Sequence, residues 1–339
     1  MAEHRPWPTS HIQGVAVDQA NGFVYYSFTT VLVKATLRGQ VVGTVEGWTG
    51  HLGDLTFNAL DGRVYGSLEY KGAAAFYVAI FDVDKIGRVG IGAQNSDVLS
   101  IVYLPEVVGD YTADLDGDGL FAGDTADTRD HRYGCSGIDG IAFGPAFGSS
   151  DKKQYLTVAY GIYKNNKRDD NNHQVLLQYD TDDWARFEHP LDERQPYREG
   201  PPVPAGKYFV HTGNTRYGVQ NLEYSQWDRV WLLSVYPGSK PKFPHYSLFA
   251  VSAGAKPVVK KLAGVPGETG AVLPLAAAGL KDRATGIRGW KKSLPYGVQA
   301  LGPKLYYLAG KSGKVGAAKA VASLHKWTGK AKSPFVAVK

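Results

Sequence analysis

One short pattern occurs five times along this chain, and it constrains the fold more than any other feature. Each copy has a glycine or a polar pair followed by a strand of alternating apolar residues. The copies are HIQGVAVD (11–18), HLGDLTFN (51–58), SGIDGIAFG (136–144), YGVQNLEYS (217–225) and YGVQALGP (296–303). Aligned, they share a column of large aliphatic residues: Val15, Leu55, Ile141, Leu222 and Leu301. Internal repetition of this kind indicates a fold that uses one structural unit several times.

Further candidate strands follow each copy. The second strand is rich in aromatic and β-branched residues, as in GFVYYSFTT and RVWLLSVYP, and the third and fourth resemble VLVKATL and QVVGTVEG of the first unit. In the fourth unit the third and fourth candidates are YSLFAVS and PVVKKLA. Four antiparallel strands in five units predict an all-β fold, a five-bladed β-propeller of four-stranded antiparallel blades. Two β-sandwiches are the alternative, but the recurring first strand fits them less well.

The spacing of the copies predicts a single β-propeller domain over residues 1–339. Its blades should cover approximately 11–50, 51–133, 134–214, 215–293 and 294–339. The first unit has the usual length of one blade, about 40 residues. The next three are longer, so we expect insertions in blades 2–4.

Composition excludes several classes of protein. The net charge is +6, but no dense Lys/Arg run with interleaved aromatic residues occurs, so we expect no nucleic-acid partner. The sequence contains no run of 18 apolar residues, so we expect no membrane span. The single cysteine, Cys135, excludes an internal disulfide framework. We expect a monomer. The start MAEHRPWPTS has no apolar signal core, yet Met1 is the only methionine, so we favour a secreted protein whose signal peptide is absent from this sequence.

The propeller architecture predicts where the functional residues meet. The first strands surround the axis, so the residues that lead into them gather at one mouth, where the loops between second and third strands also open. Such concave, polar and aromatic-lined mouths bind ligands. The residues expected there are His11, Gln13, His51, Asp54, Asp139, Tyr217, Gln220, Asn221, Tyr296 and Gln299, joined by Glu69 and Tyr163 from the ends of second strands. The alternative is that they only satisfy backbone groups between blades.

One carboxylate interrupts a column of small residues. Ala16, Thr56, Ala142 and Gly302 occupy this column in four copies, and Glu223 occupies it in the fifth. A carboxylate near the axis must be paired or have a raised pKa, which makes it a candidate acid or base. The alternative is a structural ion pair with an arginine.

The segment DLDGDGLFAGDT (114–125) predicts a metal site. Asp114, Asp116 and Asp118 alternate, a glycine follows, and the carbonyl of Leu120 comes next, as at the front of an EF-hand loop. Position 125 is threonine instead of the usual glutamate, and Asp124 lies one residue early. We therefore expect a structural Ca²⁺ that orders the insertion, with these five residues as ligands. A solvated acidic loop is the alternative.

Two Arg-Tyr-Gly segments lead into the third and fourth blades. The first follows His131 and contains Arg132 and Tyr133, and the second follows Asn214 and contains Arg216. Two arginines at one mouth favour an anionic or polyhydroxy ligand.

The whole pattern resembles a family of uncharacterised bacterial β-propeller proteins. More loosely, the five-bladed layout is similar to that of glycoside hydrolases that act on furanosides and arabinans. That resemblance implies three carboxylates around the mouth: a base, an acid, and a third that positions and tunes the acid. The matching positions are Asp54, Asp139 and either Glu69 or Glu223.

Three hypotheses for function follow. The first is a carbohydrate-active enzyme, a glycoside hydrolase with Asp54 or Asp139 as base or nucleophile and Glu69 or Glu223 as acid. The second is a uronate-directed polysaccharide or oligosaccharide lyase, in which arginine neutralises the sugar carboxylate and His or Tyr removes a proton. It would draw on His51, His131, Arg132, Tyr133 and Tyr217. The third is a non-catalytic sugar-binding propeller, which predicts similar pockets in all blades.

Overall fold

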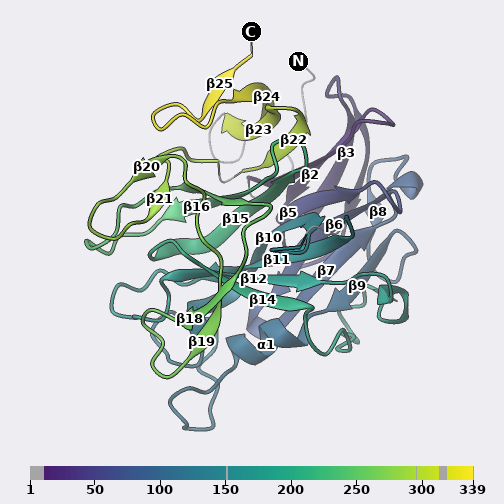
Figure 1. Ribbon diagram of the computed structural model, residues 1–339. Coiled ribbons are helices and arrows are strands. Elements are labelled where there is room, and N and C mark those ends of the chain that lie inside the picture. Colours follow the sequence, from purple (N-terminus) through teal and green to yellow (C-terminus); the bar gives the residue numbers. More distant parts are fainter. Residues whose placement is uncertain (1–10, 150–151, 295, 313–318, 339) are drawn as a thin grey trace.

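The computed structural model describes residues 11–149, 152–294, 296–312 and 319–338, which are nearly all in strands and turns (Figure 1). The five copies of the repeated pattern form the innermost strands, which are β1 (Ile12–Asp18), β5 (His51–Asn58), β10 (Cys135–Pro145), β15 (Thr215–Ser225) and β22 (Val298–Gly302). Each contacts the next in chain order, and β22 contacts β1. The chain is therefore a five-bladed β-propeller, as the repeats predicted.

Further strands extend each blade outward by antiparallel pairing. Blade 1 adds β2 (Phe23–Phe28), β3 (Val31–Thr36) and β4 (Val41–Glu46), and blade 2 adds β6 (Arg63–Tyr70), β7 (Ala75–Phe81) and β9 (Leu99–Tyr103). Blade 3 adds β11 (Gln154–Ile162), β12 (His173–Tyr179) and β14 (Gly206–His211). Blade 4 adds β16 (Val230–Pro237) and β17 (Leu248–Ser252), and blade 5 adds β23 (Leu305–Ser312), β24 (Lys319–Trp327) and β25 (Phe335–Ala337).

The insertions do not all stay with their own blade. The short strand β8 (Ile91–Gly92) follows β7 of blade 2 but pairs with β4 of blade 1. Likewise β13 (His189–Pro190) follows β12 of blade 3 and pairs with β9 of blade 2. After β17 of blade 4, β18 (Val258–Lys261) pairs with β19 (Thr269–Val272), which pairs with β14 of blade 3. Each insertion therefore ties its blade to the preceding one.

The prediction for the fourth strand of blade 4 was wrong in its placement. The segment PVVKKLA does form a strand, β18, but at the outer edge of blade 3. In the described residues the sheet of blade 4 has three strands, and Trp290 closes its edge through a bridge to Leu248. An alternating pattern predicts a strand but not its partner, because the partner depends on the path of the connecting loop. A small hairpin, β20 (Leu280–Lys281) with β21 (Arg288–Gly289), lies in the same insertion.

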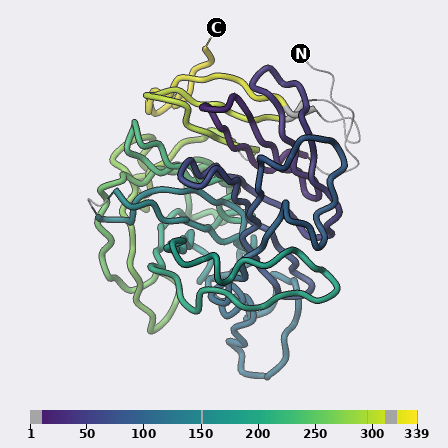
Figure 2. The backbone as a smooth tube through the Cα atoms, turned by 90° about the vertical axis from the view of Figure 1, so that its right-hand side faces the viewer, coloured from purple at the N-terminus to yellow at the C-terminus, as the bar shows by residue number. Residues whose placement is uncertain are grey.

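Apolar side chains fill the spaces between neighbouring blades. Four residues of the aliphatic column each belong to a different cluster of buried side chains: Val15, Leu55, Ile141 and Leu222. The fifth, Leu301, is partly buried and packs against the cluster that contains Val15. Blades 5 and 1 meet through side chains around Val15 and Ala309, and the two blades lie side by side in both views (Figures 1 and 2). A Cβ at Gly297 would approach Val15 Cγ1 to 2.7 Å, so this contact requires glycine. The ring is closed here by packing.

The helix α1 (Pro105–Tyr111) begins the longest insertion of blade 2, which continues to residue 131 and projects from the ring (Figure 2). Among the described residues, no helix has the length and apolar character that a membrane span requires.

At the axis, one buried carboxylate joins three blades. Asp54 Oδ2 accepts hydrogen bonds from the backbone N–H of Ile141 (3.2 Å) and of Leu222 (2.8 Å), and its Oδ1 accepts one from Asn221 Nδ2 (3.0 Å). The same Asn221 amide donates to the carbonyl of Gln13 at 2.7 Å. Blades 1–4 are therefore connected through two side chains that water does not reach.

We expect Asp54→Ala to lower the free energy of unfolding by about 3–5 kcal/mol, because it leaves two buried backbone N–H groups without an acceptor and removes one of the two acceptors of the Asn221 amide. Urea unfolding followed by circular dichroism measures this change. The matched control is Asp183→Ala, an exposed aspartate without a side-chain cap bond, with a change below about 0.5 kcal/mol. Equal effects of the two substitutions would contradict the role of Asp54.

Candidate functional site at the axial mouth

A pocket of about 570 Å³ opens at the axis, and we call it the axial pocket. Blades 1–4 line it with His11, Gln13, His51, Glu69, Lys71, Ser136, Ile138, Asp139, Gly161, Arg216, Tyr217, Gln220 and Tyr236. Eight of these were predicted to meet there: His11, Gln13, His51, Glu69, Asp139, Arg216, Tyr217 and Gln220. The structure therefore brings together residues from four distant stretches of chain. Whether each of them acts on a ligand stays a prediction.

Irregular pairing in the inner strands aims side chains at this pocket. In four blades the pairing of the first and second strands shifts register at or beside one column, which holds Gln13, Gly53, Asp139 and Gln220. A bulge of this kind bends the strand and redirects a side chain. Three of these four residues line the axial pocket. The fourth is Gly53, where a Cβ would lie 2.5 Å from Asp139 Oδ1.

Two carboxylates, Glu69 of blade 2 and Asp139 of blade 3, line the axial pocket. Burial, followed by the nearby Glu69 carboxylate, raises the pKa of Asp139 well above its usual range. Gln220 Nε2 donates to Asp139 Oδ2 at 2.5 Å. Burial also raises the pKa of Glu69, while Lys71 and the N–H of Ile138 (3.1 Å) oppose that increase. The direct contact with Lys71 therefore favours the ionised form of Glu69.

Lys71 and His51 lie beside Glu69 in the axial pocket. Lys71 Nζ lies 3.4 Å from Glu69 Oε1, and His51 Nδ1 lies 3.6 Å from the same oxygen. Burial alone would lower the pKa of Lys71, but Glu69, Asp124 and Asp139 together raise it above its usual value. Burial and the charge of Lys71 lower the pKa of His51 to about 4, so its imidazole is neutral near pH 7.

The rim of the axial pocket carries Arg216 and two tyrosines. The guanidinium of Arg216 lies over the ring of Tyr217, 5.1 Å from its centroid, and donates to the Tyr217 hydroxyl at 3.3 Å. Tyr236 packs edge-on against Tyr217, with ring centroids 6.1 Å apart. Tyr217 is 46% exposed and has a left-handed backbone with a φ of 69°. A bulky residue in that conformation costs roughly 1–3 kcal/mol, and such strain concentrates at functional sites.

Four residues that were predicted at the mouth do not line the axial pocket and instead form hydrogen bonds between blades. Asp54 and Asn221 form the axial connection described above. Glu223 is buried and accepts hydrogen bonds from the N–H of Ala300 (2.7 Å) and from Gln299 Nε2 (3.0 Å), which joins blades 4 and 5. The predicted arginine partner of Glu223 is replaced by these two donors. None of these four residues lines the axial pocket, and their roles in catalysis or ligand binding stay predictions.

His131, predicted as catalytic, is also a structural residue. Its side chain is fully buried, with Nδ1 2.6 Å from the carbonyl of Tyr111 and Nε2 3.1 Å from the carbonyl of Gly123. Its ring packs against Tyr163, whose hydroxyl donates to Asp124 Oδ1. These contacts hold the insertion of blade 2 in place, and neither ring lines the axial pocket.

The remaining predicted residues do not line the axial pocket. Arg132 Nη1 and the Tyr133 hydroxyl both donate to Glu268, at 3.0 and 2.8 Å, so they anchor the blade 4 insertion to blade 3. Asn214 bonds to neighbouring loops through Asn166 and the N–H of Lys240. Tyr296 packs edge-on against His11, with ring centroids 5.1 Å apart, and so supports one pocket residue.

Sequence reasoning missed Lys71, although a signal for it was present. The residue follows the second strand of blade 2, in the loop that was predicted to open at the mouth, and it stands two positions after Glu69. The prediction considered carboxylates and aromatic residues in that loop and passed over its cation.

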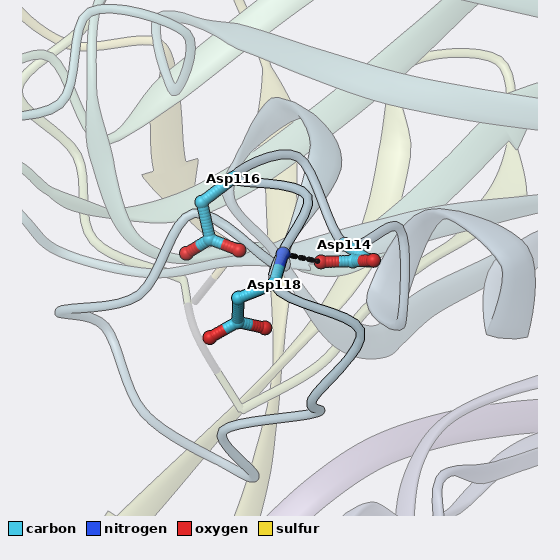
Figure 3. Close-up of side chains that lie close together, drawn as sticks. All are labelled: Asp114, Asp116 and Asp118. Atoms are coloured by element: carbon cyan, nitrogen blue, oxygen red, sulfur yellow. Dashed lines mark hydrogen bonds between the residues drawn. The ribbon is translucent and has the colours of Figure 1, made fainter.

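The aspartate-rich loop has the arrangement expected at its front. Carboxylate oxygens of Asp114, Asp116 and Asp118 lie within 4.8 Å of one another (Figure 3). The backbone N–H of Asp118 donates to Asp114 Oδ1 at 3.1 Å, and that of Gly119 donates to Asp114 Oδ2 at 3.2 Å. Asp124 lies outside this cluster and bonds to Tyr163 instead. Three of the four predicted carboxylate ligands therefore converge.

Comparison with known proteins gives weak structural similarities and no family. No protein-family model matches the sequence, and no curated protein matches it. Among solved structures, the chain is similar to the Dos1 propeller, with 9% identity, a TM-score of 0.36, and coverage of 96% of this chain and 69% of that one. It is similar to Kuenenia stuttgartiensis hydrazine synthase at 10% identity and a TM-score of 0.35, covering 96% and 66%. A protein of unknown function from Bacteroides caccae follows at 11% and 0.30, covering 72% and 78%.

We expect Lys71→Met to raise the pKa of Asp139 further, because the lysine charge favours the ionised carboxylate. Carboxyl-carbon NMR titration measures this pKa, and the signal is assigned by its loss in Asp139→Asn. The control Lys152→Met removes an exposed lysine and should leave the titration unchanged. An unchanged or lowered pKa in Lys71→Met would contradict the electrostatic assignment.

Proposed function

We propose that this protein is a carbohydrate-active enzyme that hydrolyses glycosidic bonds in the axial pocket. The observation that carries the proposal is the pair Glu69 and Asp139, two interacting carboxylates with different environments in one concave site. Most glycoside hydrolases use two carboxylic residues, one protonated and one ionised, on either side of the scissile bond. Pairs whose surroundings separate their pKa values are the usual mark of such a division of roles.

The surroundings favour Asp139 as the acid and Glu69 as the base or nucleophile. Asp139, whose pKa is raised by burial and by Glu69, would protonate the leaving oxygen. Glu69 has Lys71 at 3.4 Å, and this charge favours its ionised form. Glu69 would then activate water or attack the anomeric carbon. Lys71 acts through these two carboxylates as a positioning residue.

Polar and aromatic groups around the pair suit a sugar. Gln13 and Gln220 offer amides near the carboxylates, and Tyr217 and Tyr236 offer rings at the rim. Amides exchange hydrogen bonds with hydroxyl groups, and an aromatic face covers the apolar side of a pyranose or furanose ring. The non-catalytic hypothesis expects similar pockets in all blades, whereas this pocket takes different residues from each of four blades.

A specific observation favours lyase chemistry as the second candidate. His51 is neutral near pH 7, and its Nδ1 is buried without a hydrogen-bond partner among the described residues. Arg216, at the rim of the same pocket, could neutralise a uronate carboxylate. A neutral imidazole could then remove the proton beside that carboxylate.

We expect Asp139→Asn and Glu69→Gln each to reduce glycan cleavage by about 10²–10⁴-fold, because each removes one acid or base. Purified protein is incubated with a panel of glycans, and the products are separated by chromatography. The control Asp183→Asn should retain full activity. Full activity in both pocket variants would rule out the hydrolase assignment.

The same digestion separates hydrolysis from elimination. A lyase product contains an unsaturated uronate and absorbs ultraviolet light, whereas a hydrolysis product does not. If absorbing products form and His51→Ala abolishes them, the lyase candidate replaces the hydrolase.

We also propose that Asp114, Asp116 and Asp118 bind a structural Ca²⁺, with the carbonyl of Leu120. Alternating carboxylates followed by a glycine turn are the oxygen ligands that Ca²⁺ prefers. The insertion that they belong to reaches the site, because Asp124 lies near enough to raise the pKa of Lys71. A cation here would order the loop beside the axial pocket and would take no part in the chemistry.

We expect saturating Ca²⁺ to raise the midpoint of thermal unfolding by about 2 °C or more, since a ligand that binds only the folded state stabilises it. Differential scanning fluorimetry with Ca²⁺ and with EDTA measures the shift. Asp116→Asn should remove it, and Asp183→Asn should not. A Ca²⁺ response that survives in Asp116→Asn would place the ion elsewhere.

A further inference from the structure

The axial pocket continues as a trough over blade 2. A neighbouring cavity of about 380 Å³ shares His51, Glu69 and Lys71 with it. A third cavity of about 210 Å³ shares Thr49, Tyr70 and Ala73 with the second. Because each cavity shares lining residues with the next, the three adjoin one another in a row that begins beside Glu69. We call the third cavity the distal cavity.

The outer wall of the trough is a segment of blade 3 that crosses blade 2. After β13, residues 191–198 pass over the turn between β6 and β7. Glu193 fixes this segment by accepting hydrogen bonds from the N–H of Thr49 (2.6 Å) and from the Tyr70 hydroxyl (2.7 Å). Its own N–H donates to Gln94 Oε1 at 3.0 Å. The wall is therefore anchored to blades 1 and 2 through hydrogen bonds from neutral groups, and Glu193 itself lines the distal cavity.

The floor of the distal cavity is apolar with aromatic walls. Buried Ile101 and Leu191 line it together with Tyr77 and Tyr70, whose rings meet edge-on at 6.0 Å. The Tyr77 hydroxyl is buried without a hydrogen-bond partner among the described residues. An apolar floor with aromatic and a few polar groups is the composition of a small-molecule subsite, and it suits the face of a sugar ring.

The distal cavity is lined by one cation, Arg198, and by two carboxylates, Asp192 and Glu193. Asp192 accepts hydrogen bonds from the backbone N–H groups of Arg194 and Gln195. Arg198 is exposed and donates to the carbonyl of Ala73 at 3.0 Å, but within the described part of the chain it forms no ion pair. Arg216 at the axial pocket likewise bonds to a tyrosine hydroxyl and to no carboxylate there. The trough therefore has an available guanidinium at each end. Guanidinium groups bind carboxylates in a bidentate manner, which favours acidic occupants.

We infer that the trough binds a linear acidic oligosaccharide, with one glycosidic bond at Asp139 and Glu69 and a uronate residue of the same chain at Arg198. This inference rests on the proposed glycan-cleaving function and adds the substrate class, a chain of carboxylate-bearing sugars that spans several sugar residues. It also makes Arg198 a specificity-determining residue outside the reacting centre. A disaccharide would fill only the axial pocket, so affinity should increase with chain length.

Binding measured without turnover tests this inference. Oligogalacturonates and oligoglucuronates of two to six residues are titrated into the Asp139→Asn protein by calorimetry, with carboxyl-reduced oligosaccharides of the same lengths as neutral probes. We expect the longer acidic chains to bind about tenfold more tightly than the disaccharides. Adding Arg198→Ala should remove this gain and leave disaccharide binding unchanged. The matched control Arg194→Ala removes an exposed arginine of the same segment that does not line the cavity.

The outcomes separate the subsite from the reaction. A length-dependent gain that survives in Arg198→Ala overturns the distal subsite, and equal binding of neutral and acidic chains overturns the acidic class, as does failure of every acidic chain to bind. Either result leaves the glycan digestion as an independent measure of the proposed activity. If acidic chains bind as expected and wild-type protein cleaves none of them, the subsite stands and the proposed function fails.

Discussion

The hydrogen bonds of the Asp54 carboxylate are the interaction on which this propeller depends. Inner strands of a propeller have one edge facing the axis, where no further strand can satisfy their backbone groups. Asp54 provides acceptors for two of these groups, from blades 3 and 4, and pairs with Asn221, which reaches blade 1. Its burial is tolerated because these donors replace water, although burial still raises its pKa. The axis is thus stabilised by polar contacts, while apolar clusters pack neighbouring blades against one another.

The same inner strands supply both the hydrogen bonds of Asp54 and the residues of the axial pocket. Adjacent positions along the strand serve the two roles. Asp139 occupies the column that the bulges turn toward the axial pocket, and Asp54 occupies the next column. That next column is Gly14, Asp54, Gly140, Asn221 and Ala300. A Cβ at Gly14 would approach Asp54 Cα to 2.6 Å, so small residues there make room for the two that bond to each other. A carboxylate and an amide in an otherwise small column indicate a buried pair.

Much of the fold could be predicted because it depends on repetition, and much of the site could be predicted because repetition fixes which residues share a position. The five inner strands and eight residues of the axial pocket follow from that logic. The destinations of β8, β13 and β18 do not, since strands of two to four residues contain too little pattern to specify a partner. His131 illustrates the same limit: its type suggested chemistry, but its contacts with two loop carbonyls depend on how the insertion folds.

The insertions that make the blades unequal also remove the equivalence of the blades around the mouth. A ring of five equivalent blades would present the same groups in every direction around the axis, and nothing in it would orient a chain-like ligand. Here the segment at residues 191–198 reaches back from blade 3 over blade 2 and lines the distal cavity. The contact that strengthens the join between two blades therefore also gives the pocket a direction. Glu193 links these effects, because its bonds to Thr49 and Tyr70 fix the segment that also carries Arg198.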